Sequence, residues 1–323
     1  MADSPALLKD NGTAVAPVRA RENFSIHQCV GQADMRTSAM NMPRYHSSPI
    51  AGTGKVLAFR TGTRVPAGLR NRVWMIAELE RALEQDRLVL HYQPQYDIKT
   101  QRVVGVEALV RLVTTSGTLI GPDEFIKLAE ESGQILQLGR WVMEEACQQL
   151  GRWQQAGLGR LRMAVNISPC QLMENDFCAL VDAAVSRAGI RHSDLELEIT
   201  ERQLVDTLPC IEQTLHKLTA KGVHLAVDDF GSGYSSMAYL VQLAIGTVKV
   251  DRDFISRVSE DERAGYIVKL NIAMARELGL GLSAGGIETE GQRRFLLHSG
   301  CELGQGYHFA RPQHAGAVER FLF

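Results

Sequence analysis

The feature that most constrains the fold is an alternation of short apolar runs with longer amphipathic stretches, which begins near Val73 and continues to the end of the chain. Runs such as VVGVEALVRL and LELEIT have the length and composition of buried β-strands. Stretches between them, such as ERAGYIVKLNIAMAREL, repeat apolar residues at helical spacing. Strands that alternate with helices favour a parallel sheet. About eight such units in roughly 250 residues predict an α/β fold, a (β/α)₈ TIM-like barrel.

Residues 1–72 differ from the rest of the chain. They are rich in Ala, Ser, Thr, Gly, Pro and Arg and show no sustained apolar period, as in MPRYHSSPIAGTGK. We expect a flexible N-terminal extension without a recognisable domain, followed by one domain over residues 73–323. An inert tail and a partner-docking or regulatory arm both fit residues 1–72, and no motif supports the second.

Composition limits which partners and which cellular compartment we expect for this chain. The formal net charge of −2 gives no reason to expect a nucleic acid polymer or an anionic membrane as a partner. No run of 18 apolar residues predicts a transmembrane helix, and the start of the chain lacks the apolar core of a secretory signal. The 6 cysteines include no C-x-x-C pair, which favours reduced thiols in the cytoplasm.

Polar residues stand late in the predicted strands, where this fold places its active face. A buried polar group costs free energy unless it is paired. A lone Asn166 or Glu107 would fit a satisfied core position, but a set spread over several strand ends indicates a site. The set comprises Glu107, Arg111, Asn166, Glu198, Glu201, Asp228, Asp229, Lys249, Asp251 and Gln305.

The chemistry of this set favours a metal-dependent phosphate reaction. Its oxygen donors, with no His or Cys at ligand spacing, favour Mg²⁺ or Mn²⁺ over zinc. The adjacent Asp228 and Asp229 could serve two ions roughly 3.5–4 Å apart, which can clamp the attacking and leaving oxygens of a phosphodiester. Lys249 and Arg111 would add positive charge for a phosphate. The following GSGYSS is either an ordinary turn or a segment that orders around a ligand or a partner subunit.

At these residues the chain resembles the EAL family of bacterial proteins, which hydrolyse cyclic di-GMP to linear pGpG. The resemblance covers about residues 73–323, and its motifs are specific because they occur together and in order. They are HYQPQ, GVEALVR, VNISPCQL, LELEITE, VDDFGSGYSSMAYL, VKVDRDFI, GGIETEGQ and GCELGQGYHFARP.

The resemblance implies an EAL-type barrel whose first strand, RLVLHYQPQ, is antiparallel to the others, and a homodimer formed through GSGYSSMAYL. It also implies a role for each matching residue. A first metal would be held by Glu107, Asn166, Glu198 and Asp228, and a second by Asp228 and Asp229. Lys249 would position the attacking water, Gln305 would lie near the metals, and Glu201 would anchor the DDFGSGYSS loop. The ligand would lie beside Gln93, Leu109, Arg111, Asp251 and Glu288, with Arg111 on a phosphate.

One position departs from the family pattern. Where this chain reads SAGGIETEG, the family shows Ala-Glu-Gly-Val-Glu, so Gly285 replaces a glutamate that serves as second-metal ligand and general base. Loss of a general base alone typically costs about 10²–10⁴-fold in rate. A water molecule or a rotated Glu288 could substitute in part. A second departure, LVTTSGTLIGP after the EAL motif, changes a loop beside the expected pocket.

Three functions remain open at this point. The first is a cyclic di-GMP receptor or regulator that hydrolyses its ligand weakly or not at all, and Gly285 favours it. The second is a working phosphodiesterase that uses Mg²⁺ or Mn²⁺. The third is a protein-interaction regulator that needs no nucleotide. No cyclase, receiver or sensor motif is visible in residues 1–72, so the input signal is not indicated.

Overall fold

The computed structural model describes residues 67–231 and 238–322, all within the compact unit Arg60–Phe323. The expectations for residues 1–66 and for most of the GSGYSS segment lie outside these residues. Within the described part of the chain, no helix is long and apolar enough to cross a membrane.

The predicted barrel is present, and its first strand is antiparallel as expected. Strand β1 pairs antiparallel with both β2 and β9, which closes the sheet, while the strands from β2 round to β9 run parallel. The short strand β3 extends the outer end of β2. The strands are β1 Leu88–Asp97, β2 Val103–Val113, β3 Leu119–Ile120, β4 Arg162–Asn166, β5 Leu195–Thr200, β6 His224–Phe230, β7 Thr247–Val250, β8 Gly281–Ala284 and β9 Leu303–Gly304.

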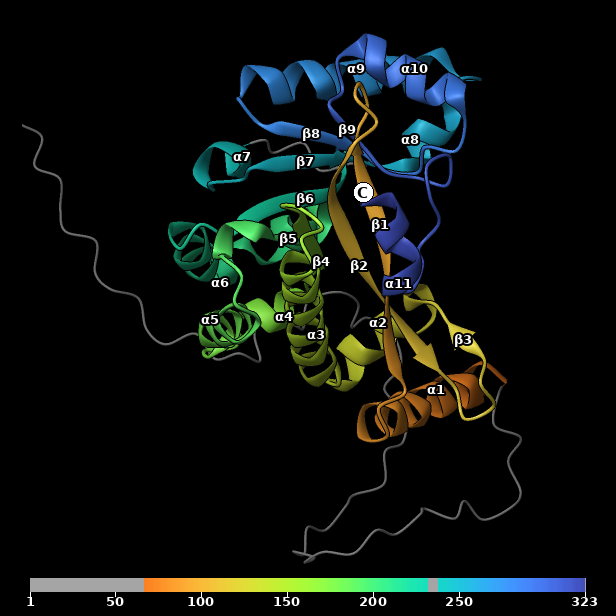
Figure 1. Cartoon of the computed structure of the whole chain (residues 1–323), viewed down its shortest axis with the longest axis vertical. Helices are drawn as coiled ribbons and strands as arrows, with labels where there is room; N and C mark the ends of the chain where they lie inside the picture. The colour runs from red at the N-terminus through yellow and green to blue at the C-terminus, as the bar shows by residue number, and fades with distance from the viewer. Residues whose placement is uncertain (1–66, 232–237, 323) are drawn as a thin grey trace, which may run out of the picture. The chain divides into compact units, whose positions relative to one another are not determined.

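Helices cover the outside of the strands (Figure 1). Two short 3₁₀ turns are also present, η2 His192–Asp194 and η3 Glu319–Phe321. The helices are α1 Ala67–Glu84, α2 Pro122–Ser132, α3 Ile135–Gln155, α4 Pro169–Leu172, α5 Phe177–Ala188, α6 Glu201–Ala220, α7 Ala238–Gln242, α8 Arg252–Arg257, α9 Glu262–Glu277, α10 Glu290–Ser299 and α11 Ala315–Val318.

Helix boundaries follow local chemistry more closely than the apolar pattern alone indicated. The long stretch after β3 is two helices, because Gly133 adopts a left-handed φ of 78° that ends α2. Helix α6 begins at Glu201, directly after the LELEIT strand, because the Thr200 side chain accepts a hydrogen bond from the backbone amide of Gln203 and caps the helix. Helix α1 begins at Ala67, before the predicted start at Val73.

The barrel interior is polar at both ends of the strands. Near the amino ends of the parallel strands, buried Glu196 accepts hydrogen bonds from Arg162 (3.0 Å) and Thr247 (3.4 Å). Glu198 stands two residues further along the same strand and therefore shares the inward face with Glu196. The carboxyl ends consequently receive a second layer of polar side chains, which forms the site described below.

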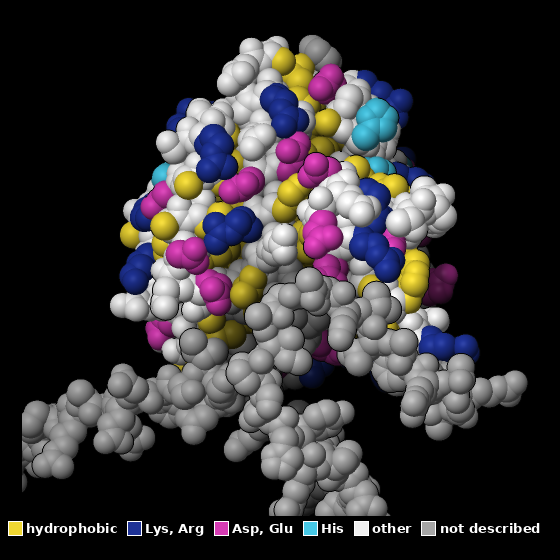
Figure 2. All heavy atoms as spheres, turned by 90° about the horizontal axis from the view of Figure 1, so that it is seen from below, with side chains coloured by type: hydrophobic (Ala, Val, Ile, Leu, Met, Phe, Trp, Pro, Cys, Tyr) yellow, Lys and Arg dark blue, Asp and Glu magenta, His cyan; other side chains and the backbone are white. Residues whose placement is uncertain are grey.

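The outer surface carries charges of both signs. On the face seen in Figure 2, Lys and Arg side chains are interspersed with Asp and Glu, and neither sign gathers into a broad patch. This distribution agrees with the small formal net charge of −2.

Glycine allows the segment after β9 to approach the segment after β8 closely. A Cβ at Gly306 would lie 2.1 Å from the Ile287 carbonyl oxygen and 2.3 Å from the Ile287 nitrogen. Both contacts are to backbone, which has no freedom to move aside. Gly306 follows Gln305, whose amide donates to the Ala284 carbonyl (2.9 Å).

We predict that Gly306→Ala lowers the free energy of unfolding by at least about 2 kcal/mol, because the added methyl group overlaps backbone. Gly291→Ala is the matched control, since a Cβ there meets nothing nearer than Thr289 Oγ1 at 3.8 Å and the position is helical. Urea unfolding of both variants measures the difference. Equal stability of the two variants would contradict the packing argument.

Candidate functional site

Strand register brings the predicted polar residues of neighbouring strands together. Asn166 on β4 is the register partner of Glu198 on β5, and the residue beside Glu107 on β2 is Ala164 of β4. Parallel neighbours in register face the same side of a sheet, so these side chains converge inside the carboxyl end of the barrel. Asn166 Nδ2 donates to Glu107 Oε1 at 2.7 Å, which joins β2 to β4 directly.

The Lys249 ammonium group lies among the carboxylates of this cluster. Its Nζ is 2.6 Å from Glu198 Oε2, 3.4 Å from Glu107 Oε2 and 3.7 Å from Asp228 Oδ2. The side chains of Lys249 and Glu198 are only 6% and 0% exposed, so little solvent screens this pair. One cation therefore holds together acidic groups from three strands.

Burial and charge shift the pKa values of the cluster in opposite directions. Burial by itself lowers the pKa of Lys249, but attraction to Asp228, Glu107 and Glu198 raises it well above its usual range. Burial and then repulsion by Glu107 raise the pKa of Glu198 well above the usual value for a glutamate. Burial also opposes ionisation of Glu107, yet Lys249 and hydrogen bonds from Gln305 and Asn166 bring its pKa below the usual value.

An amide chain continues the cluster across β9 and β1. Gln305 Nε2 donates to Glu107 Oε2 and to Gln93 Oε1, both at 2.7 Å, and Gln93 Nε2 donates to the Ala310 carbonyl at 2.9 Å. Two acceptors in the cluster remain without a hydrogen-bond partner although they are buried, namely Glu198 Oε1 and Gln305 Oε1. Such acceptors are the groups that a bound cation or ligand donor would satisfy.

The acidic pair at the end of β6 differs between its two members. Asp228 Oδ1 accepts from the Asp229 amide at 2.9 Å, and its other oxygen faces Lys249. Asp229 adopts a left-handed φ of 52°, which directs it to a different side of the chain. Partial burial and the charges of Asp228 and Asp251 raise the pKa of Asp229 to about 6. Asp251 itself caps α8 through Asp253.

Other predicted ligand-binding residues lie at the rim. Leu109 and Arg111 follow Glu107 at alternate positions of β2 and so share its face, and Arg111 is partly exposed with Nη1 donating to the Val110 carbonyl. His91 is the register partner of Leu109, and its pKa is lowered by burial and by the Arg111 charge. Sequence reasoning missed His91, although its alternation with Gln93 along β1 indicated a shared face. Glu288 is exposed beyond β8.

Glu201 is buried and contacts the start of the loop after β6. Its Oε2 accepts from the Gly231 amide at 3.0 Å, and its Oε1 accepts from the Tyr239 hydroxyl at 3.1 Å. Burial raises the pKa of Glu201 despite these hydrogen bonds. The carboxylate therefore connects both ends of the segment that includes the undescribed residues 232–237.

Gly285 directly follows β8 and has room for a side chain. Ser283, two residues earlier, is the register partner of Lys249, so a side chain at position 285 would point to the same face as Lys249. A Cβ built at Gly285 meets only the Val250 carbonyl oxygen, at 4.0 Å, and its φ is not left-handed. Gly286 is different, because its φ is 69° and a Cβ there would lie 2.7 Å from Arg252 Cβ. The backbone thus requires glycine at 286 but not at 285.

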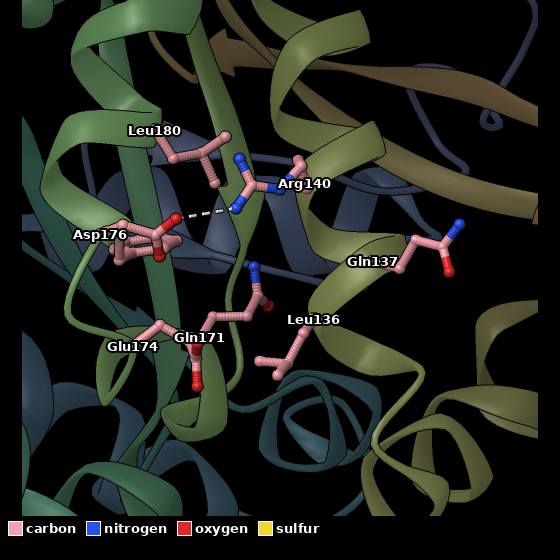
Figure 3. Close-up of a pocket in the computed structure, with 8 residues that line it drawn as sticks. Leu136, Gln137, Arg140, Gln171, Glu174, Asp176 and Leu180 are labelled. Carbon is pink, nitrogen blue, oxygen red and sulfur yellow. Dashed lines mark hydrogen bonds and ion pairs between the residues drawn. The ribbon is translucent and has the colours of Figure 1, made fainter.

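A separate cavity of about 250 Å³ lies between α3, α4 and α5, outside the barrel mouth. Figure 3 shows Arg140 paired with Asp176 across it (3.0 Å), with Leu136 and Leu180 on its walls. None of the residues that line it belongs to the carboxylate cluster. Gln171, which also lines it, connects this helix layer to the strand ends and was not found from the sequence.

The structure thus defines a (β/α)₈-type barrel with carboxylates, amides and a lysine gathered at the carboxyl ends of its strands. Comparison with protein families places this chain within a known one. The EAL domain model matches residues 76–312. The chain belongs to the EAL domain family.

Similar proteins agree with this assignment. The signaling protein YkoW of Bacillus subtilis is 38% identical over 311 residues, which cover 96% of this chain and 37% of that protein. The cyclic di-GMP phosphodiesterase NbdA of Pseudomonas aeruginosa is 41% identical over 277 residues, 86% of this chain and 35% of that protein. This chain therefore spans little more than a third of these relatives. A solved structure titled "PaMucR Phosphodiesterase, c-di-GMP complex" is 38% identical, covers 76% of this chain and 99% of its own, and has a TM-score of 0.73.

We predict that Lys249→Met lowers the free energy of unfolding by about 3 kcal/mol in buffer without divalent cations, because it leaves buried carboxylates without their cation. The pKa of Glu198 is already raised in the fold, so its ionisation destabilises the native state as the pH rises. The loss of unfolding free energy in Lys249→Met, relative to the unmodified chain, should therefore be larger at pH 8 than at pH 5. Chemical unfolding at both pH values measures it. Lys127→Met, at an exposed position of α2, is the control; an equal effect of the two substitutions would refute the role of Lys249.

Proposed function

We propose that this chain is a cyclic di-GMP-binding EAL domain that hydrolyses its ligand weakly or not at all and acts as a receptor or regulator. The observation that carries the proposal is Gly285, which leaves the end of β8 without a carboxylate while the rest of the cluster is assembled. Relatives named as cyclic di-GMP phosphodiesterases, and the solved complex of one of them, support the choice of ligand. Buried free thiols at Cys147 and Cys301 agree with action in the cytoplasm.

The donor set fits Mg²⁺ or Mn²⁺. Glu198 Oε1 is buried without a partner, and the surrounding donors are carboxylate and amide oxygens, which these ions prefer. Among the described residues no group of three or more His, Cys, Asp or Glu side chains is placed to hold a metal ion by itself, and the Lys249 ammonium group lies among the carboxylates. A first ion would be held by Glu107, Asn166, Glu198 and Asp228, and a second by Asp228 and Asp229.

When bound, such ions polarise the phosphate and lower the pKa of a coordinated water. The chain's own residues would do the remaining work. Lys249 would orient the attacking water, and Arg111 at the rim would bind a phosphate oxygen. Gln93 and Gln305 would hold Glu107 in place through the amide chain described above. Glu201 would hold Gly231 and so the backbone that follows the acidic pair.

Gly285 affects the reaction more than it affects binding. A glutamate at this position would supply an anionic ligand to the second ion and a proton acceptor for the water. Without it, the second site keeps only the acidic pair, and general-base catalysis, typically worth about 10²–10⁴-fold, is lost. Binding of the nucleotide would still have Arg111, Lys249 and the first ion available. The chain is therefore suited to retain the ligand rather than to turn it over.

We predict that the full chain binds cyclic di-GMP in the presence of Mn²⁺ but hydrolyses it slowly to pGpG. Gly285→Glu should accelerate this hydrolysis by at least about 10²-fold. The open space around Gly285 means that the glutamate enters without displacing backbone. Gly285→Gln has nearly the same size and no carboxylate, so it should remain slow. Chromatography of pGpG and calorimetry of binding separate the two effects.

Each alternative function has its own outcome in this experiment. Rapid hydrolysis by the unmodified chain, unchanged in Gly285→Glu, would mean a working phosphodiesterase whose second ion is held in another way. No binding of cyclic di-GMP by the unmodified chain in Mn²⁺ or Ca²⁺ would favour a regulator that acts through a protein partner without nucleotide. Equal acceleration by glutamate and glutamine would show that size, not the carboxylate, is limiting.

The second part of the proposal is a homodimer. The family resemblance places its interface at GSGYSSMAYL, most of which lies outside the described residues, and α9 offers a further exposed surface for the contact. This helix exposes Tyr266 and Leu270, each 64% accessible, together with Ile267 at 37%. Arg263 and Glu277 lie on the same helix at equal distances on either side of Leu270, and both are exposed. Neither side chain has an ion-pair partner among the described residues. Two copies of α9 crossing antiparallel at Leu270 would therefore bury the apolar stripe and place each Arg263 beside the Glu277 of the other copy.

We predict that Leu270→Asp converts the protein to a monomer at micromolar concentration, measured by light scattering, because a buried charge would lie at the centre of the interface. Leu278→Asp, 40% exposed just beyond the helix, is the control and should leave the mass unchanged. Reversal of charge at Arg263 or Glu277 alone should weaken the dimer, and reversal of both should restore it. A monomeric unmodified chain would refute the dimer.

A further inference from the structure

A carboxylate outside the barrel connects two of the junctions that carry the site. Glu130, in the last turns of α2, is half-buried. Its Oε1 accepts a hydrogen bond from Ser168 Oγ at 2.7 Å and another from Gln203 Nε2 at 3.2 Å. Ser168 follows β4 and Gln203 lies in the first turn of α6, so one oxygen atom joins segments that are far apart in sequence.

The Ser168 side of this contact is tightly built. Ser168 is buried, and its amide donates to Gln171 Oε1 at 3.0 Å. Gln171 is itself only 4% exposed and packs directly against α3, since a Cβ at Gly139 would lie 2.0 Å from Gln171 Nε2. Ser168 stands two residues after Asn166, so its position sets where the β4 strand end can lie.

The Gln203 side leads to the neighbouring strand. Gln203 Oε1 accepts from the Thr200 hydroxyl at 3.0 Å, and the Gln203 amide donates back to Thr200 Oγ1 at 3.4 Å. Thr200 ends β5, two residues after Glu198. Asn166 and Glu198 are register partners on β4 and β5. Glu130 therefore connects the same two strands, through hydrogen bonds to residues that lie just beyond their carboxyl ends.

We propose that Glu130 is a positioning residue, which sets the separation of Asn166 and Glu198 by accepting hydrogen bonds from both Ser168 and Gln203. The proposal deepens the function given above, since it rests on Asn166 and Glu198 holding a divalent cation. Because a single oxygen of Glu130 accepts both hydrogen bonds, a glutamine at this position keeps the acceptor and a leucine does not. Outer partners of metal ligands typically change metal affinity about 10–100-fold when they are removed.

The test compares Glu130→Leu, Glu130→Gln and the control Glu131→Leu in the full chain. Glu131 is the next residue on α2, and its ion pair is with Arg72 on the surface. Manganese alone is the probe, with its affinity and its electron paramagnetic resonance spectrum measured, and hydrogen exchange reports on the backbone of each variant. We expect Glu130→Leu to weaken Mn²⁺ binding about tenfold, alter the spectrum and speed exchange at Ser168–Leu172 and Thr200–Leu204. Glu130→Gln should recover most of the affinity, and Glu131→Leu should change neither property.

Several results would overturn the positioning role of Glu130. One is unchanged hydrogen exchange at both junctions in Glu130→Leu; another is a loss of Mn²⁺ affinity that Glu131→Leu reproduces. Faster hydrogen exchange in Glu130→Leu with unaltered Mn²⁺ affinity would mean that Glu130 only stabilises the two junctions, and it would reject the positioning role. If the unmodified chain bound no Mn²⁺, the metal part of the proposed function would fail, and the exchange measurement would still decide whether Glu130 holds the two junctions. Ser168→Ala combined with Glu130→Leu should be no worse than Glu130→Leu alone, because Glu130→Leu already removes the hydrogen bond that Ser168 Oγ donates.

Discussion

The ion cluster around Lys249 is the interaction on which the rest of this structure depends. Several acidic side chains point into the carboxyl end of a closed barrel, where their mutual repulsion would oppose folding. Lys249 contacts Glu198, Glu107 and Asp228 and so offsets that repulsion within a space that solvent barely reaches. The arrangement also explains why Glu198 has a raised pKa while Glu107 has a lowered one. Glu107 receives hydrogen bonds from two amides, whereas one oxygen of Glu198 receives none.

Support for this cluster comes from outside the barrel as well as from within it. Inside, the amide chain from Ala310 through Gln93 and Gln305 reaches Glu107. Outside, Glu130 connects the ends of β4 and β5, and Glu201 holds the backbone after β6. Next to Gln305, the absence of a side chain at Gly306 allows the backbone to approach Ile287 closely. Groups that contact a ligand or a metal must be held by neighbours that do not, because a side chain with free rotamers cannot keep such geometry.

Gly285 is the position at which the sequence is expected to depart from the family pattern. The strand end beside it keeps its register with β7, and the surrounding backbone would accept a side chain. Gly286, in contrast, is required by a left-handed φ and by the proximity of Arg252. The difference indicates that the glycine at 285 does not serve the fold. Its proposed consequence is chemical: one carboxylate fewer on the face that we propose holds the cations, while the surrounding backbone leaves room for a side chain.

The sequence by itself determined the class of fold and the polar residues at the strand ends, while the antiparallel first strand was expected only from the family resemblance. It could do so because strand and helix periods are local properties, and because a charged residue within an apolar run is conspicuous without any structure. Several helix limits and the short elements β3, α4 and α8 were missed, since they depend on caps and turns that the apolar period does not report.

Only the tertiary structure decided how the site is assembled. The sequence placed Lys249 near the acidic residues but could not show that it lies among three of them. It also gave no sign of Glu130, which resembles any helical glutamate until Ser168 and Gln203 are brought to it from other parts of the chain. The physical reason is that strand register and close packing bring together atoms widely separated in sequence, and hydrogen bonds between such atoms leave no local pattern.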